Sequence, residues 1–181
     1  MRKLISKKDK PKIIKEGQFL RLIQHGGWEY SQRTNCTGIV VIIGMTEDKR
    51  VILTKQFRPP IKKHCIEFPA GLVNDRGLKS KESMSTAARR EMLEETGYHA
   101  KKLTKIICGP VSPGSSSDLM TLFLAQGLTK KSSGGGDQSE NIEVCEIPFK
   151  TVTQWVKKME STGCLVDPKV FAGLYFLMQY S

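Results

Sequence analysis

The chain has 181 residues, with 29 Lys or Arg and 18 Asp or Glu, which give it a formal net charge of +11. This length fits one domain with its own hydrophobic core, and the ordinary composition excludes a wholly disordered chain. No apolar run reaches the roughly 18 residues of a membrane span, and no apolar stretch follows the basic N-terminus as in a secretory signal. We therefore expect a cytoplasmic protein without a membrane partner, in which residues 1–15 form a basic flexible tail.

The positive charge would suit a polyanionic partner, either nucleic acid or a small phosphate-bearing substrate. Because the tail explains much of the excess and the chain has no aromatic platform typical of RNA-binding domains, nucleic acid is not expected as a partner. The salt dependence of RNA affinity after deletion of residues 1–15 would test this exclusion. Five scattered cysteines without a CxxC pair predict reduced thiols, not a disulfide framework or a zinc site.

The part of the chain before residue 75 favours strands. Residues 18–24 alternate apolar and polar side chains, as a half-buried strand does. Further strands are predicted where β-branched and aromatic residues gather, at 28–33, 38–45, 51–57 and 65–71, the last of which enters a Gly/Pro turn.

The remainder combines helices and strands. Residues 83–96 predict a helix that ends at Gly97. Later strands are expected at 103–108, 119–125 and 142–147, helices at 149–160 and 168–180, and Gly/Ser-rich loops at 112–118 and 129–141. Many strands with one central and two late helices predict an α+β domain layered as an α/β/α sandwich, spanning residues 16–181.

The central helix carries three carboxylates near its end. Met84, Ala88, Glu91 and Glu95 are four, three and four residues apart, so they lie on one stripe, with Glu94 beside it. The stripe begins apolar and becomes acidic in the last two turns. The carboxylates therefore continue the face that packs inward.

This placement is electrostatically unfavourable. Glutamates four residues apart repel each other by a few tenths of a kcal/mol, and each acid near a helix C-terminus opposes the macrodipole by roughly 0.3–1 kcal/mol. Arg89 and Arg90 can compensate in part. A divalent metal can supply the rest, because carboxylate oxygens are hard ligands suited to Mg²⁺ or Mn²⁺.

The wider pattern begins at Glu82 and reads E-x7-R-E-M-x-E-E-x-G-Y. It resembles the Nudix box, G-x5-E-x7-R-E-U-x-E-E-x-G-U with U apolar, at every position from Glu82 to Gly97, with Tyr98 a loose fit at the last. The leading glycine of the box falls on Arg76, and Gly71 is the better equivalent. That equivalence implies about five extra residues within 74–81, before the helix.

Motifs outside the box resemble the ADP-ribose pyrophosphatase or ADP-sugar diphosphatase branch of the family. They are WEYSQR at 28–33, QFRPP at 56–60, CIEFPAGL at 65–72, SPG at 112–114, ENIEV at 140–144, and VDPKVFAGLYFL near the C-terminus. The resemblance covers residues from about 17 to 178. It implies a mixed central sheet with an N-terminal antiparallel strand extension, and hydrolysis of the pyrophosphate of ADP-ribose or a related ADP-sugar to AMP and a sugar phosphate. It also implies Mg²⁺ as the metal, with Mn²⁺ as an alternative.

The resemblance assigns roles to the carboxylates and their neighbours. It implies that the metal is bound by Glu91, Glu94, Glu95 and the backbone carbonyl of Ala70. A structural pair between Glu82 and Arg90 would hold the helix and the loop before it in place.

The general base is expected on the late loop. Glu140 matches the position of a loop glutamate in this branch, and we take Glu140 and Glu94 as the catalytic candidates. Gln138 stands where some relatives have an acid and cannot accept a proton, so Asp137 and Glu143 are the alternatives. The glycines at 134–136 would let this loop close over the substrate.

Substrate recognition is expected from the strands before the box and from the loop at 112–118. Trp28 can stack on a nucleobase, and the planar donors of Arg33 and Arg58 can pair with phosphate oxygens. The resemblance further implies that the nucleotide pocket is lined by Glu29 and the Leu72 backbone, and that Ser112 lies near the terminal sugar.

The assembly and the exact reaction follow from the same resemblance. Enzymes of this branch are homodimers with exchanged N-terminal strands, here residues 16–36, and Trp28 would then enter the neighbour's site. One alternative is a hydrolase of another nucleoside diphosphate sugar, such as GDP-mannose. A second is a non-catalytic Nudix-fold nucleotide sensor, which predicts lost carboxylates in the box, where this chain has lost none.

Overall fold

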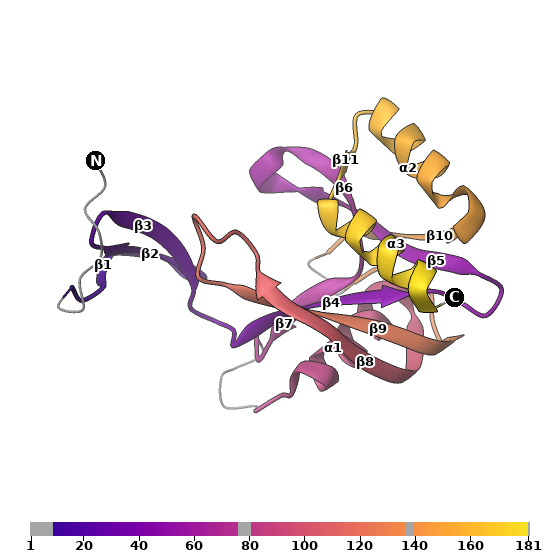
Figure 1. Ribbon diagram of the computed structural model, residues 1–181, viewed down its shortest axis with the longest axis horizontal. Coiled ribbons are helices and arrows are strands. Elements are labelled where there is room, and N and C mark those ends of the chain that lie inside the picture. Colours follow the sequence, from indigo (N-terminus) through magenta and orange to yellow (C-terminus); the bar gives the residue numbers. More distant parts are fainter. Residues whose placement is uncertain (1–8, 76–80, 137–139, 181) are drawn as a thin grey trace.

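The computed structural model describes residues 9–75, 81–136 and 140–180 (Figure 1). The strands are β1 (Lys12–Glu16), β2 (Leu20–His25), β3 (Trp28–Arg33), β4 (Gly38–Gly44), β5 (Arg50–Arg58), β6 (Lys63–Glu67), β7 (Ala70–Val73), β8 (Tyr98–Pro110), β9 (Leu119–Lys130), β10 (Ile142–Pro148) and β11 (Leu165–Val166). The helices are α1 (Met84–Thr96), α2 (Val152–Ser161) and α3 (Pro168–Tyr180). No helix in these described ranges is both long and apolar enough to cross a bilayer.

The described strands form three sheets, with the orders β1-β2-β3, β10-β5-β6-β11 and β7-β4-β9-β8. The latter two are mixed, because β4 runs parallel to β9 and β6 runs parallel to β11 while their other pairs are antiparallel. In Figure 1 the β1-β2-β3 sheet projects from the rest of the molecule, away from α2 and α3.

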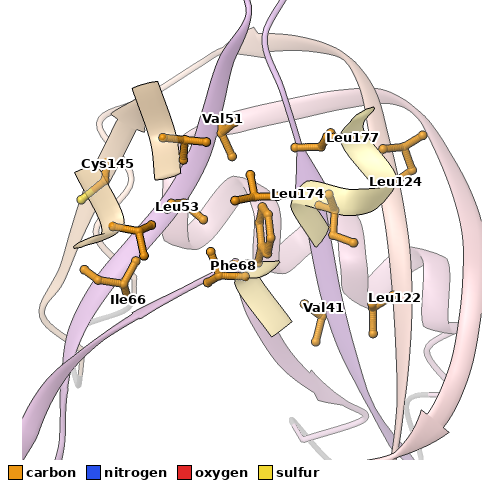
Figure 2. Packing of buried hydrophobic residues seen from close by; sticks show 14 residues of the cluster. Val41, Val51, Leu53, Ile66, Phe68, Leu122, Leu124, Cys145, Leu174 and Leu177 are labelled. Atoms are coloured by element: carbon orange, nitrogen blue, oxygen red, sulfur yellow. The ribbon is translucent and has the colours of Figure 1, made fainter. Parts of the chain in front are cut away.

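Alternation along the buried strands divides the core into two layers. Val41 and Ile43 of β4 face a cluster that includes α2 and α3, whereas Val40 and Ile42 face a second cluster that includes α1. Figure 2 shows side chains of the first cluster gathered around Phe68. Helices therefore cover both faces of the central sheets, and the predicted α/β/α sandwich is confirmed.

Three elements differ from the sequence-based expectation. The segment assigned to a basic tail contains β1, which pairs antiparallel with β2 although all its side chains are exposed. The single strand predicted at 65–71 is two strands, interrupted at Phe68 and Pro69, because proline has no backbone N–H to continue a ladder. The strand predicted at 103–108 starts earlier, at Tyr98, directly after the left-handed Gly97 that ends α1.

The helix that carries the carboxylates is held at both ends. Ser83 is its N-cap, and the hydroxyl oxygen of Ser83 accepts a hydrogen bond from the Thr86 N–H at 3.1 Å. Before it, Asn74 and Glu82 exchange hydrogen bonds: the Asn74 N–H donates to Glu82 Oε2 at 3.2 Å, and the Glu82 N–H donates to Asn74 Oδ1 at 2.6 Å. Most of the predicted insertion at 74–81 lies outside the described residues, but these bonds join its two ends.

Candidate active site

A cavity of about 500 Å³ opens where β7 passes the carboxylate end of α1. Its lining is rich in charged side chains of both signs. The acids are Glu67, Asp75, Glu91, Glu94 and Glu140, and the cations are Arg33, Arg58, Arg90 and Lys169. A cavity with this composition suits a ligand that bears both phosphate and bound cations.

Two of the helix carboxylates are buried, as the inward stripe predicts. Glu91 is 8% exposed and Glu95 is 2% exposed, because the same face of α1 packs Ala88 and Met92 against the sheet. Burial first, and then the neighbouring Glu91 charge, raise the pKa of Glu95 to about 9. Burial raises the pKa of Glu91 to about 7 in spite of the opposing charge of Arg90. Both buried carboxyl groups therefore favour their protonated forms more than an exposed glutamate does.

The β7 backbone lies directly against these carboxylates. The Ala70 N–H donates to Glu95 Oε2 at 3.1 Å. A Cβ atom at Gly71 would overlap the carboxyl group of Glu91, so only glycine lets the strand approach this closely. Ala70, Gly71 and Glu91 consequently line the same wall of the cavity.

Arg90 connects the box residues to one another. Its Nε donates to Glu82 Oε1 at 2.9 Å, so the structure brings together the two residues expected to form a structural pair. Its Nη1 donates to Glu91 Oε1 at 2.7 Å and to Glu94 Oε2 at 3.2 Å. Its Nη2 donates to the Leu72 carbonyl oxygen at 3.0 Å. The pKa of Arg90 is raised, first by the hydrogen bonds that it donates to Glu82 and then by the charge of Glu91.

The donor set at this end of α1 fits a hard divalent cation. Within the described ranges no three His, Cys, Asp or Glu side chains are already grouped to hold a metal ion, and Arg90 Nη1 lies between Glu91 and Glu94. However, Glu91 and Glu95 are buried carboxylates with raised pKa values, and a bound divalent ion is the charge that would favour their ionised forms.

Glu140 lines the same cavity. Its charge also contributes to the raised pKa of Glu95, which places the two carboxylates within electrostatic reach of each other. Glu143 does not line the cavity. Its carboxylate instead accepts a hydrogen bond from Lys55 Nζ at 2.8 Å. Asp137 and Gln138 lie outside the described residues.

Three of the expected substrate-binding residues line the cavity: Arg33, Arg58 and Leu72. The Arg58 guanidinium makes a two-bond pair with Glu67, with Nε–Oε1 at 2.8 Å and Nη2–Oε2 at 2.6 Å. Arg33 Nε lies 3.7 Å from Asp118 Oδ2. Arg58 is thus oriented by an acid at the cavity wall, whereas the ion pair between Arg33 and Asp118 is too long for a hydrogen bond.

The other three expected substrate-binding residues lie away from this cavity. Trp28 borders a separate cavity of about 290 Å³, together with Tyr30 and Pro113. Glu29 is exposed on β3 and lines neither cavity. The Ser112 hydroxyl lies 2.7 Å from the Ser115 hydroxyl within its own loop. One chain by itself therefore does not bring these three residues to the carboxylates.

Sequence reasoning did not single out Glu67, Asp75 or Lys169. Glu67 and Lys169 occur inside the motifs CIEFPAGL and VDPKVFAGLYFL, so the motifs contained the signal. Lys169 Nζ is paired with the Asp167 carboxylate at the start of α3, and this pairing places a lysine from the C-terminal helix at the cavity.

Comparisons with known proteins agree with this geometry. A family model described as the NUDIX domain matches residues 36–162. ADP-ribose pyrophosphatase of Bacillus subtilis (strain 168) is 36% identical over 124 residues, covering 68% of this chain and 64% of that protein. Methanol dehydrogenase activator of Bacillus methanolicus is 31% identical over 141 residues, covering 77% and 71%. GDP-mannose pyrophosphatase of Escherichia coli (strain K12) is 30% identical over 142 residues, covering 77% and 72%.

The fold has a close solved counterpart, described as the crystal structure of an ADP compounds hydrolase. The two chains superpose with a TM-score of 0.68 at 19% identity, over 98% of this chain and 96% of the other. The matched domain covers most of the sequence, and Arg90, Glu91 and Glu94 of the box line the cavity of about 500 Å³ described above. The chain belongs to the Nudix family.

Proposed function

We propose that this chain hydrolyses the pyrophosphate of ADP-ribose or a related ADP-sugar to AMP and a sugar phosphate, with Mg²⁺ as its metal and Mn²⁺ as an alternative. The observation that carries the proposal is one cavity lined by two helix carboxylates, Glu91 and Glu94, and by two arginines, Arg33 and Arg58. The similarity to ADP-ribose pyrophosphatase of B. subtilis supports the choice of substrate.

Each group has a chemical task in this proposal. Glu91, Glu94, Glu95 and the Ala70 carbonyl hold the divalent metal, on which Nudix hydrolases depend. When bound, such an ion neutralises pyrophosphate oxygens and lowers the pKa of coordinated water.

The remaining residues bind the substrate and move the proton. Arg33 and Arg58 pair with phosphate oxygens, and Leu72 lines the nucleotide pocket. Glu140, or Glu94 in its place, accepts the proton of the attacking water. The pair of Arg90 and Glu82 holds the end of the carboxylate helix and the loop before it in place.

We propose that the active form is a homodimer built through the N-terminal sheet. Apolar side chains of this region are exposed in a single chain, among them Phe19 at 54%, Leu20 at 47% and Leu22 at 39%. A second copy would cover them. It would also bring its own Trp28 and Glu29 to the base of the bound nucleotide, and Ser112 would lie nearer the terminal sugar.

The proposed substrate can be tested by comparing kcat/KM for ADP-ribose, ADP-glucose, GDP-mannose, NADH and a capped RNA, each with and without Mg²⁺. We expect the highest value with ADP-ribose or ADP-glucose, and AMP as the product. The similarity to GDP-mannose pyrophosphatase of E. coli makes GDP-mannose a specific alternative substrate. A preference for it would leave the proposed pyrophosphate hydrolysis unchanged and would mean that the site selects guanine in place of adenine. Binding of ADP-ribose without turnover of any substrate would instead support a nucleotide sensor.

A further inference from the structure

We propose that Gly134, Gly135 and Gly136, hereafter the glycine segment, are positioning residues that fix Glu140 relative to the carboxylates of α1. This inference rests on the proposed function, because it takes Glu140 as the group that receives the proton. It differs from the sequence-based expectation, in which the same glycines served as a hinge for loop closure.

The glycine segment is hydrogen-bonded to the end of the carboxylate helix. The Gly135 N–H donates to the Glu95 carbonyl oxygen at 2.9 Å, and the Gly136 N–H donates to the Glu94 carbonyl oxygen at 3.1 Å. Carbonyls in the last turn of a helix have no partner within the helix. The segment therefore binds the backbone of the same two residues whose side chains are candidate metal ligands.

The other side of the glycine segment contacts Glu140 and the strand after it. The Gly135 carbonyl oxygen accepts a hydrogen bond from the Ile142 N–H at 3.2 Å. A Cβ atom at Gly136 would lie 2.5 Å from Glu140 Oε2 and 2.8 Å from Glu140 Cβ. Backbone hydrogen bonds thus run from α1 through Gly135 to Ile142, two residues after Glu140, while the neighbouring Gly136 lies against the Glu140 side chain.

Only glycine fits this path. The φ angles of Gly134 and Gly136 are +70° and +83°, in the left-handed region that L side chains rarely adopt. A Cβ atom at Gly134 would lie 2.6 Å from the Glu95 carbonyl oxygen and would overlap the backbone of Thr96. A side chain there would push the segment off the helix.

The same contacts reduce the electrostatic cost of acids at a helix C-terminus. Two N–H dipoles point their positive ends at the carbonyls where the macrodipole is negative, next to the side chains of Glu94 and Glu95. These contacts therefore anchor the glycine segment to the end of α1, and Glu140 takes its position from that anchor.

The test compares Gly134→Ala and Gly136→Ala with a matched control. Gly163→Ala provides the control, because Gly163 has a φ of +90° but open space around its Cβ position, in the turn after α2. We expect kcat to fall about 10–100-fold in both site variants, with KM within about twofold of wild type and Mn²⁺ affinity largely retained. The control should keep wild-type kcat, although it shares the backbone strain.

A double-mutant cycle separates positioning from a general loss of structure. In a Glu140→Gln background, whose residual turnover is measured with more enzyme, Gly134→Ala should cause no further loss of kcat, because the group that it misplaces is already disabled. Equal losses in both backgrounds, or no loss in the wild-type background, would overturn the inference alone. No turnover of any nucleoside diphosphate sugar by the wild-type chain would refute the proposed function and this inference with it.

Discussion

At the scale of single residues, the site is defined by two largely buried carboxylates at the end of α1. Glu91 and Glu95 are buried because they continue the apolar stripe of α1, and burial raises their pKa values. Burying two carboxylates costs stability and would bring no benefit to a purely structural helix, but it preorganises the two groups as ligands for a divalent cation.

The first prediction concerns stability against pH in the presence of a chelator. The folded pKa of Glu95 is about 9 and its ordinary value is 4.5, so folding binds a proton between these values. Stability from this group is therefore complete below about pH 4.5 and is lost as the pH rises toward 9. Urea unfolding at a series of pH values should show this decline, and Glu95→Gln should flatten it. Saturating Mg²⁺ should also remove it; an unchanged slope in Glu95→Gln would contradict the assignment.

The second prediction concerns Gly71, whose missing side chain makes room for the Glu91 carboxylate. Gly71→Ala should lower kcat/KM by on the order of 10–100-fold, because Glu91 must move from the metal-binding position. The control is Gly109→Ala, a strand glycine with open space at its Cβ position. Steady-state kinetics on both variants is the measurement, and equal activities would show that Glu91 tolerates the displacement.

The sequence predicted the individual residues of the box better than their partners. The spacing of Glu91 and Glu95 on one helix face is a local property, and the structure places both inward. The pairing of Arg58 with Glu67 and the arrival of Lys169 depend on how β5, β6 and α3 come together. No local pattern encodes such contacts, so the motifs marked the segments without showing what each side chain touches.

At the scale of elements, α3 packs close to the sheet because it carries a glycine at the contact. A Cβ atom at Gly173 would lie 2.8 Å from Cζ of Phe68 and would overlap another atom of the same ring, in the cluster shown in Figure 2. Close packing at this point fixes the start of α3, from which Lys169 reaches the cavity.

The third prediction uses this contact, where two effects oppose each other. Helix propensity alone would make Gly173→Ala stabilising by about 1 kcal/mol. Overpacking against the buried Phe68 should outweigh it and give a net destabilisation of about 1–2 kcal/mol. Urea denaturation decides the sign, and a more stable variant would mean that the Phe68 ring moves freely.

A strand could be predicted where its buried residues leave a recognisable pattern of apolar side chains in the sequence. The β-branched run of β4 indicated a central strand, and β4 pairs with strands on both sides. β1 was missed because its side chains are all exposed, so only its backbone pairing with β2 makes it a strand. Backbone pairing between segments leaves no periodic signal in the sequence of an exposed strand.

At the scale of the whole molecule, the projecting N-terminal sheet is the feature whose apolar side chains remain exposed in a single chain. The alternating apolar residues of this sheet predicted a buried face, yet Leu20 and Leu22 are exposed in the single chain. Trp28 borders a separate cavity and does not line the one that contains the carboxylates. A homodimer through this sheet would account for both observations.

The fourth prediction tests that assembly. Leu22→Lys should shift the protein from dimer to monomer and raise the dimer dissociation constant about 10-fold or more, because a charge would be buried in an apolar interface. Ile107→Lys, at an apolar residue of β8 that is 50% exposed, is the control and should leave the dimer intact. Light scattering across a concentration series measures both, and a wild-type chain that is monomeric throughout would refute the assembly.

The most direct test of the whole account is ³¹P NMR of ADP-ribose incubated with the protein and Mg²⁺, with Glu95→Gln alongside. We expect the pyrophosphate signals of the wild-type reaction to be replaced by those of two phosphomonoesters, AMP and ribose 5-phosphate. Glu95→Gln should be slower by on the order of 10²-fold or more, because it loses part of the charge stabilisation that a bound metal provides. Pyrophosphate signals that persist with the wild-type protein, or turnover that is unaffected by Glu95→Gln, would contradict it.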